Sequence, residues 1–310
     1  MNESSIESKV WEDTPLWDKI ISTGVVILAA TLNILVISTY LSSHQLQKYF
    51  TNRIMVSLAV TDLCTCSMEI INGWIQPLFY VPSGVLGHIY CHVFHTTFLL
   101  WAFINISILH ILLISFDRYF AVLHPIKYKN FTARNLKNYS LFIAIFIIGG
   151  ATKAENLLLF RYENAECVFM SDTYNDIFYI VCGYWYVTEV SMILLMIFFI
   201  YFCIIKRVMQ MSRAKKMSNE DVKNNRLLTI LAATVTAVFL CSTFPNHIYV
   251  CIYYLKLVYK FDLDIDYNSA LYKVSIQLVL GSSLLNPLVY TIQSKPFRSE
   301  CIKMLKKLKN

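Results

Sequence analysis

The stretch "LISFDRYFAVLHPIKY", at residues 113–128, closes a long apolar run with an acid and an arginine. The run covers residues 101–116 and is interrupted only by Asn105, Ser107, His110 and Ser115. In a core helix of a soluble protein, the pair Asp117–Arg118 would be an ordinary solvated end. In a helix that crosses a bilayer, the same pair marks the place where the helix leaves the lipid and something can act on it.

The composition of the chain decides between these two readings. Of its 310 residues, 56% are hydrophobic and only 15% are charged, whereas soluble domains carry about 25% charged residues. A helix needs about 20 mostly apolar residues to cross the hydrocarbon core. We therefore expect an all-α membrane protein with a bundle of seven transmembrane helices, at residues 20–41, 54–80, 92–116, 138–160, 177–205, 227–255 and 269–292.

Lysine and arginine indicate the orientation, because they are retained in short loops on the cytoplasmic side. With the amino terminus outside, the outer segments hold only seven of the 27 basic residues. We expect an extracellular segment 1–19, a transmembrane domain 20–292 and a cytoplasmic segment 293–310, in the plasma membrane. Acidic sequence without a cleavage site precedes the first span, so this span is expected to be an anchor and not a signal peptide.

The net charge of +7 is concentrated at the rims of the spans, where it meets anionic lipid heads and cytoplasmic partners, so nucleic-acid binding is not expected. In the last segment, apolar residues recur at helical spacing among lysines and arginines, which predicts a short amphipathic eighth helix on the inner leaflet. Cys301 lies on this helix, either as a site for a palmitoyl chain or as a plain cysteine. The apolar residues are Phe297, Ile302, Leu305 and Leu308.

The nine cysteines show no metal-ligand spacing. Cys91, just before the third span, and Cys167, in the second outer loop, are expected in oxidising solvent, where a disulfide would persist. Such a bond would hold the loop over the mouth of the bundle, and two free thiols are the alternative. Asn2 lies in the only glycosylation sequon of the expected watery outer sequence.

Polar side chains inside the spans are costly unless they face the interior of the bundle. Asn33, Asp62 and Asn286 lie in the middle of three spans, so we expect them, with Ser107 and Ser283, to face one another or trapped water. A carboxylate with hydroxyl and amide oxygens suits a small hard cation such as sodium, with Asp62 and Ser107 as ligands. A hydrated network without an ion is the alternative, and no other cofactor is expected.

Five motifs follow one another along these spans. They are "LNILV" in the first span, "LAVTDL" in the second, "SILHILLISFDRYFAVLHPIKY" in the third, Phe239 with Pro245 in the sixth and "NPLVY" in the seventh. Over nearly the whole chain they resemble the rhodopsin-like (class A) G-protein-coupled receptors, and the third-span text is most similar to the biogenic-amine and trace-amine branch. The resemblance implies a receptor, not an enzyme, whose partners are an extracellular ligand and a heterotrimeric G protein.

The resemblance also implies a switch at the cytoplasmic end of the bundle. In the motif Asp117-Arg118-Tyr119, the carboxylate would hold the arginine in the resting state. On activation, Arg118 would move toward Tyr201 and Tyr290 and open a cleft for the G protein. The apolar run would then end in two charged residues because that end of the helix faces the G protein.

The ligand contacts depart from those of the amine receptors. Leu100 stands where those receptors hold the ligand ammonium with an aspartate, and Thr243 replaces the usual tryptophan of the sixth span. Glu189 or Glu69 could hold a cationic amine instead, unless each is neutralised by protonation or by an internal partner such as Lys153 or His247. The expected lining of the outer cavity is Glu189, Glu69, Leu100, Trp101, Ile104, His247, Asn246 and Ile276.

Other function classes fit the sequence less well. An opsin would need a lysine deep in the seventh span, where Leu280 stands. A transporter would more often show repeated halves and broken helices, and an enzyme would need a nucleophile–base pair or a metal motif. Two alternatives stay open within the family. One is a receptor for a peptide or lipid ligand, and the other is a signalling-impaired receptor that serves as a binding or dimerisation module, because Thr243 departs from the usual trigger.

Overall fold

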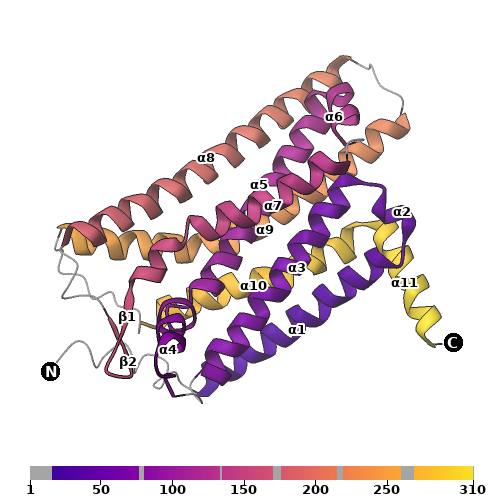
Figure 1. The fold of residues 1–310 in the computed structure, drawn as a ribbon. Helices are drawn as coiled ribbons and strands as arrows, with labels where there is room; N and C mark the ends of the chain where they lie inside the picture. The colour runs from indigo at the N-terminus through magenta and orange to yellow at the C-terminus, as the bar shows by residue number, and fades with distance from the viewer. Residues whose placement is uncertain are drawn as a thin grey trace.

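The computed structural model describes residues 16–76, 80–132, 135–169, 176–214, 219–259 and 269–309. Within these ranges, seven long helices pack into one bundle (Figure 1). A two-stranded hairpin lies at one end of the bundle, and a short helix turns away from the other end (Figure 1). The predicted all-α class and seven-helix bundle are confirmed.

The long helices are α1 (Leu16–Leu41), α3 (Phe50–Ile70), α5 (Phe98–Leu123), α7 (Asn135–Ala151), α8 (Asp176–Ala214), α9 (Asn219–Tyr259) and α10 (Ala270–Gln293). The shorter α-helices are α2 (His44–Gln47), α4 (Val85–Ile89), α6 (Pro125–Thr132) and α11 (Lys295–Lys309). Two π-helical turns, η2 (Ile71–Ile75) and η4 (Tyr90–His95), and a 3-10 turn, η5 (Ala154–Leu158), connect them. The strands are β1 (Phe160–Glu163) and β2 (Glu166–Phe169).

Six helical stretches in the described ranges are long and apolar enough to cross a membrane. The helix that is not among them is α10, which the sequence predicts as the seventh span. Its inner face carries small hydroxyl and amide side chains that are buried. It packs against α1 and α9 as part of the bundle. The buried polar residues of α10 are Ser275, Ser282, Ser283 and Asn286.

Helix α5 contacts α3, α7, α8 and α9. Its residues Ile111 and Ile114 are fully buried, together with Leu58 of α3. Helix α7 comes especially close, because a Cβ atom on Gly149 would lie 2.4 Å from Cγ1 of Ile106. A side chain larger than hydrogen at Gly149 would therefore push the two helices apart. The position of α5 lets it connect the two ends of the bundle.

The start of the third span differs from the expectation. The sequence predicts a helix from residue 92, but α5 begins at Phe98, after η4 and a residue in the left-handed region, Thr97 (φ 51°). The hydroxyl of Thr96 donates to the carbonyl of His92 at 2.7 Å, so the break keeps a local partner for that carbonyl. Threonine hydroxyls compete with the helix for backbone groups, which explains a break at this position.

The second outer loop holds an antiparallel hairpin that the sequence analysis did not predict. Strands β1 and β2 pair with Tyr162 opposite Cys167. The turn between them, at Asn164 and Ala165, has φ values of 51° and 64°. Two consecutive residues with positive φ are typical of the tight turns that match the twist of a hairpin.

Candidate functional site

A disulfide closes the end of the bundle at which α5 begins. Cys91 of η4 and Cys167 of β2 are bonded, with their Cα atoms 5.3 Å apart, which confirms the predicted bridge and excludes the alternative of two free thiols. The ring of His95 meets that of Phe160 edge-on at 4.6 Å, so side-chain contacts support the same attachment. The hairpin is therefore fixed to this end of the bundle.

A cavity lies in the same half of the bundle, between α5, α8, α9 and α10. It holds about 710 Å³ of empty space, part of which is open to solvent, and pockets for small ligands typically measure about 300–1,000 Å³. Its apolar lining consists of Trp101, Ile104, Ile108, Ile111, Val190, Ile193, Leu194, Ile197, Phe239, Leu240, Phe244 and Val279. Its polar lining consists of Asn105, Lys153, Tyr186, Glu189, Thr243, Asn246 and His247.

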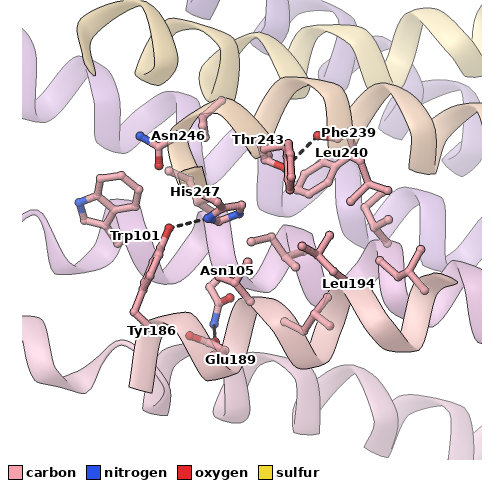
Figure 2. Close-up of a pocket in the computed structure, with 18 of the residues that line it drawn as sticks. Trp101, Asn105, Tyr186, Glu189, Leu194, Phe239, Leu240, Thr243, Asn246 and His247 are labelled. Atoms are coloured by element: carbon pink, nitrogen blue, oxygen red, sulfur yellow. Dashed lines mark hydrogen bonds between the residues drawn. The ribbon is translucent and has the colours of Figure 1, made fainter. Parts of the chain in front are cut away.

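The carboxylate of Glu189 is bound on both oxygens from inside the protein. Lys153 Nζ lies 2.6 Å from Oε2, and the two side chains are only 9% and 11% exposed. Asn105 Nδ2 donates to Oε1 at 3.0 Å (Figure 2). Lys153 also lies over the ring of Tyr186, 5.1 Å from its centroid. Of the alternatives that the sequence leaves open for Glu189, the structure shows the internal partner Lys153.

Four further polar residues of the cavity have partners in the protein. The hydroxyl of Tyr186 and Nδ1 of His247 are 2.5 Å apart across the cavity (Figure 2). Asn246 Nδ2 donates to Ser275 Oγ at 3.1 Å. Thr243 Oγ1 donates to the carbonyl of Phe239 at 2.9 Å (Figure 2). Thr243 thus gives the cavity a small side chain whose hydroxyl is used within its own helix.

Five of the eight predicted ligand contacts line this cavity, namely Trp101, Ile104, Glu189, Asn246 and His247. Leu100 is buried in α5 but does not line it, and neither do Glu69 and Ile276. Asn105 and Tyr186 also line the cavity, although neither was expected there from the sequence. A usable signal existed for Asn105, because a buried amide in an apolar run needs a partner.

The predicted polar cluster is assembled around Asp62. Ser107 Oγ donates to its Oδ1 at 2.9 Å, and Asn286 Nδ2 donates to its Oδ2 at 3.0 Å. Asn33 Nδ2 joins α1 to α10 through the carbonyl of Ser283 at 2.9 Å. The Oδ1 atoms of Asn33 and Asn286 are buried and have no hydrogen-bond partner among the described residues. Such oxygens fit a small cation or a water molecule.

At the opposite end, Asp117 and Arg118 form a closed and buried ion pair. Nε of Arg118 lies 3.0 Å from Oδ2 of Asp117, and both residues are 3% exposed. Thr51 of α3 donates to Oδ2 at 2.7 Å, and Tyr128 of α6 donates to Oδ1 at 2.7 Å. Burial and the Asp117 carboxylate raise the pKa of Tyr128, so its phenol stays a donor. Arg118 is thus held by the adjacent carboxylate, which is the arrangement that the resemblance leads us to expect of a resting state.

Two other predicted switch residues, Tyr201 and Tyr119, make their described contacts with residues outside this pair. Tyr201 is hydrogen-bonded to Thr236 of α9 at 2.9 Å. The ring of Tyr119 meets that of Phe120 edge-on at 5.4 Å. Tyr290 lies in α10, but its side chain lies outside the described residues, as does the predicted glycosylation site Asn2.

The amphipathic helix α11 packs against α1 and α10. Phe297 and Cys301 face the bundle, with 8% and 6% exposure, whereas Ile302 and Leu305 are exposed. The side chain of Leu308 lies outside the described residues. A buried thiol fits the plain-cysteine alternative for Cys301 better than a palmitoyl site, and the exposed pair provides an apolar face for the membrane.

Comparisons with known proteins agree with this geometry. The family described as "7 transmembrane receptor (rhodopsin family)" matches residues 32–290. Dopamine receptor 3 of Caenorhabditis briggsae is 32% identical over 60% of this chain and 29% of its own length. The tachykinin-like peptides receptor 86C of Drosophila melanogaster is 23% identical over 93% of this chain and 58% of its own length. The allatostatin-A receptor of Bombyx mori is 24% identical over 80% of this chain and 68% of its own length. The chain thus spans under a third of the first of these relatives.

Proposed function

Because the chain belongs to the rhodopsin family of seven-transmembrane receptors, we propose that it binds a small extracellular ligand in the cavity and activates a heterotrimeric G protein at the opposite end. The amino terminus then lies outside the plasma membrane and α11 rests on the inner leaflet. The distribution of lysine and arginine supports this orientation. The disulfide at the cavity end also supports it, because disulfides persist on the oxidising side.

One observation carries the proposal, namely that a single helix forms parts of both sites. Asn105 of α5 lines the cavity and binds Glu189, and Arg118 lies 13 residues further along the same helix. At 1.5 Å per residue the two sites are about 20 Å apart. A ligand that shifts or rotates α5 therefore acts on the Asp117–Arg118 pair without a separate relay.

The ion pair between Lys153 and Glu189 favours a ligand whose group next to Glu189 carries no charge. An ammonium bound there would displace Lys153, and a buried charge without its partner costs about 3–5 kcal/mol. Most of the remaining wall is apolar. We therefore propose a small ligand with an apolar body and polar groups near Asn246 and His247. A cationic amine at Glu189 is the competing candidate, and the relatives named dopamine receptor 3 favour it.

A peptide ligand is a second candidate. The hairpin stands beside the mouth of the bundle, where its strands could meet an extended chain. Two relatives are named as receptors for tachykinin-like peptides and allatostatin-A, and they cover 93% and 80% of this chain. In this case the peptide would contact the hairpin as well as the cavity.

The proposal is tested by a screen of cationic amines, neutral small molecules, lipids and peptides, with G-protein dissociation in cells as the readout. Leu194 lines the cavity, whereas the next residue, Leu195, is 64% exposed on the outside of the bundle. Leu194→Trp should fill the cavity and lower the response to the best agonist at least tenfold. Leu195→Trp, the matched control, should keep it. Equal responses from both variants would place the ligand elsewhere.

The polar cluster around Asp62 is proposed as the site of an allosteric sodium ion. The support is the set of oxygen ligands and the two buried amide oxygens without a partner, Oδ1 of Asn33 and Oδ1 of Asn286. If the ion binds, exchange of sodium for choline should lower the thermal stability of wild type but not of Asp62→Asn. An equal loss in both proteins would indicate a hydrated network without an ion.

A further inference from the structure

Two histidines lie side by side at the end of the bundle that carries the disulfide. His88 belongs to α4 and His92 to η4, and residues four apart in consecutive helical turns share one face. Their rings are nearly parallel, with centroids 6.4 Å apart and an angle of 12° between the planes. His88 is exposed and His92 is half-buried, and neither lines the cavity of Glu189. The pair is therefore a separate feature that solvent can reach.

A backbone carbonyl fixes the tautomer of His92. Nδ1 of His92 lies 2.6 Å from the carbonyl oxygen of Leu157. Because a carbonyl oxygen only accepts hydrogen bonds, Nδ1 carries the hydrogen, and Nε2 of the neutral ring has a free lone pair. The described hydrogen bond of this ring does not use Nε2. A backbone carbonyl on one ring nitrogen is a usual way to orient a histidine whose other nitrogen binds a metal ion.

The hairpin positions His88. The ring of Tyr162 in β1 meets the ring of His88 edge-on, with centroids 5.0 Å apart. Strand β1 can come this close because residue 87 is a glycine, whose Cβ, if added, would lie 2.5 Å from Cε2 of Tyr162. Tyr162 pairs with Cys167 across the hairpin, and Cys167 is bonded to Cys91, the residue directly before His92. The disulfide and the hairpin thus hold both histidines in place.

The spacing of the two rings is close to that of a zinc site. Imidazole nitrogens suit zinc, copper and nickel, whereas magnesium and calcium prefer oxygen ligands. Two imidazoles on a tetrahedral zinc ion, with Zn–N bonds of about 2.0–2.1 Å, have ring centroids about 5 Å apart. The observed 6.4 Å is larger by roughly 1 Å, and rotation of the exposed side chain of His88 can close this difference.

We propose that His88 and His92 bind a zinc ion, through Nε2 of His92 and one ring nitrogen of His88, with water at the remaining positions. The described part of the chain holds no group of three or more histidines, cysteines or acids suited to a metal ion. The site therefore has two protein ligands and binds zinc reversibly. Zinc has no redox chemistry, so it is compatible with the neighbouring disulfide. The bound ion ties α4 to η4 in the segment that anchors the hairpin.

The test is a titration of zinc into the purified full-length receptor in detergent, without a polyhistidine tag, in competition with a fluorescent zinc chelator. His88 is exposed, so His88→Gln should fold like wild type. It should raise the dissociation constant for zinc at least tenfold, because loss of a residue that only orients a ligand already costs about 10–100-fold. His44→Gln, which removes an exposed histidine of α2 at the other end of the bundle (Figure 1), is the matched control and should keep the wild-type affinity.

His92→Gln tests the second ligand. The glutamine amide keeps a donor for the carbonyl of Leu157, so this variant should also lose zinc affinity at least tenfold. An unchanged dissociation constant in either variant, or no zinc binding by wild type, would overturn the proposal. So would an equal loss of affinity in His44→Gln, because zinc would then bind to surface histidines in general. The titration needs neither an agonist nor a G protein, so its failure leaves the function proposed for the cavity untouched.

Discussion

Removing one partner of the Lys153–Glu189 pair should destabilise the receptor more than removing both. Lys153 Nζ lies 2.6 Å from Glu189 Oε2, and the side chains are 9% and 11% exposed. Each charge therefore depends on the other for compensation. Breaking a buried pair typically costs about 3–5 kcal/mol. Because Asn105 still donates to Glu189 in the lysine variant, we expect Lys153→Met to lie near the lower limit, at about 3 kcal/mol.

The assay is thermal unfolding in detergent of wild type, Lys153→Met, Glu189→Gln and the double variant, followed by helical circular dichroism. In the double variant both charges are gone, and a buried pair replaced by neutral groups of similar volume often costs little. Its loss of Tm should therefore be smaller than that of either single variant. Arg161→Met, which breaks the exposed pair with Glu163 (47% and 46% exposed), should change the Tm little, since exposed pairs contribute about 0–1 kcal/mol.

If the double variant loses as much stability as the two single variants together, Lys153 and Glu189 are not coupled. Glu189 would then be free to bind a ligand ammonium, and the proposal of an uncharged ligand group at this place would be refuted.

Three further predictions concern the two ends of the bundle. Cys167→Ser removes the bond to Cys91 and should cost about 2–5 kcal/mol, seen as lower surface expression and lower ligand binding together; normal values of both would contradict the structural role of the bridge. Thr51→Val removes a hydrogen bond to Asp117, a contact worth about 1.5–3 kcal/mol, and should raise ligand-independent G-protein dissociation roughly tenfold or more, whereas an unchanged level would show that the bond does not restrain the switch. Because the pKa of Tyr128 is raised, the difference between the ultraviolet titrations of wild type and Tyr128→Phe should show one phenol that ionises above its ordinary pKa of 10.0, and ionisation at or below that value would contradict its burial beside the carboxylate.

The fold could be predicted from the sequence because lipid imposes a simple rule on each span. An apolar segment of about 20 residues must be helical to satisfy its backbone, so the seven spans can be located from composition. The ends of the helices could be located less accurately than the spans themselves. Helices α8 and α9 continue past the apolar segments to Ala214 and Tyr259, since charged residues stay helical outside the lipid. The break at Thr97 depends on local hydroxyl bonds that periodicity does not show.

Site residues could be predicted from the sequence where their position within a single span already shows that they need a partner. Asp62 and Asp117 are costly in lipid wherever they stand, so the sequence indicates that each needs partners. Glu189 also needs a partner, but that partner, Lys153, follows α7, whereas Glu189 lies in α8. Such a pairing depends on how the helices are arranged around α5. For the same reason, the sequence did not show that Glu69 does not line the cavity.

The central claim is that Arg118 transmits the state of the bundle to a G protein, and the most direct test is ligand-independent G-protein dissociation in cells. Arg118→Ala leaves Asp117 bonded to Thr51 and Tyr128, so the variant should fold and reach the surface. We predict that wild type gives a signal above that of untransfected cells and that Arg118→Ala abolishes it. Arg161→Ala, on the outer hairpin, should keep it. An equal signal from Arg118→Ala at matched surface levels, or no wild-type signal with any G-protein class, would contradict the claim and favour the binding or dimerisation module.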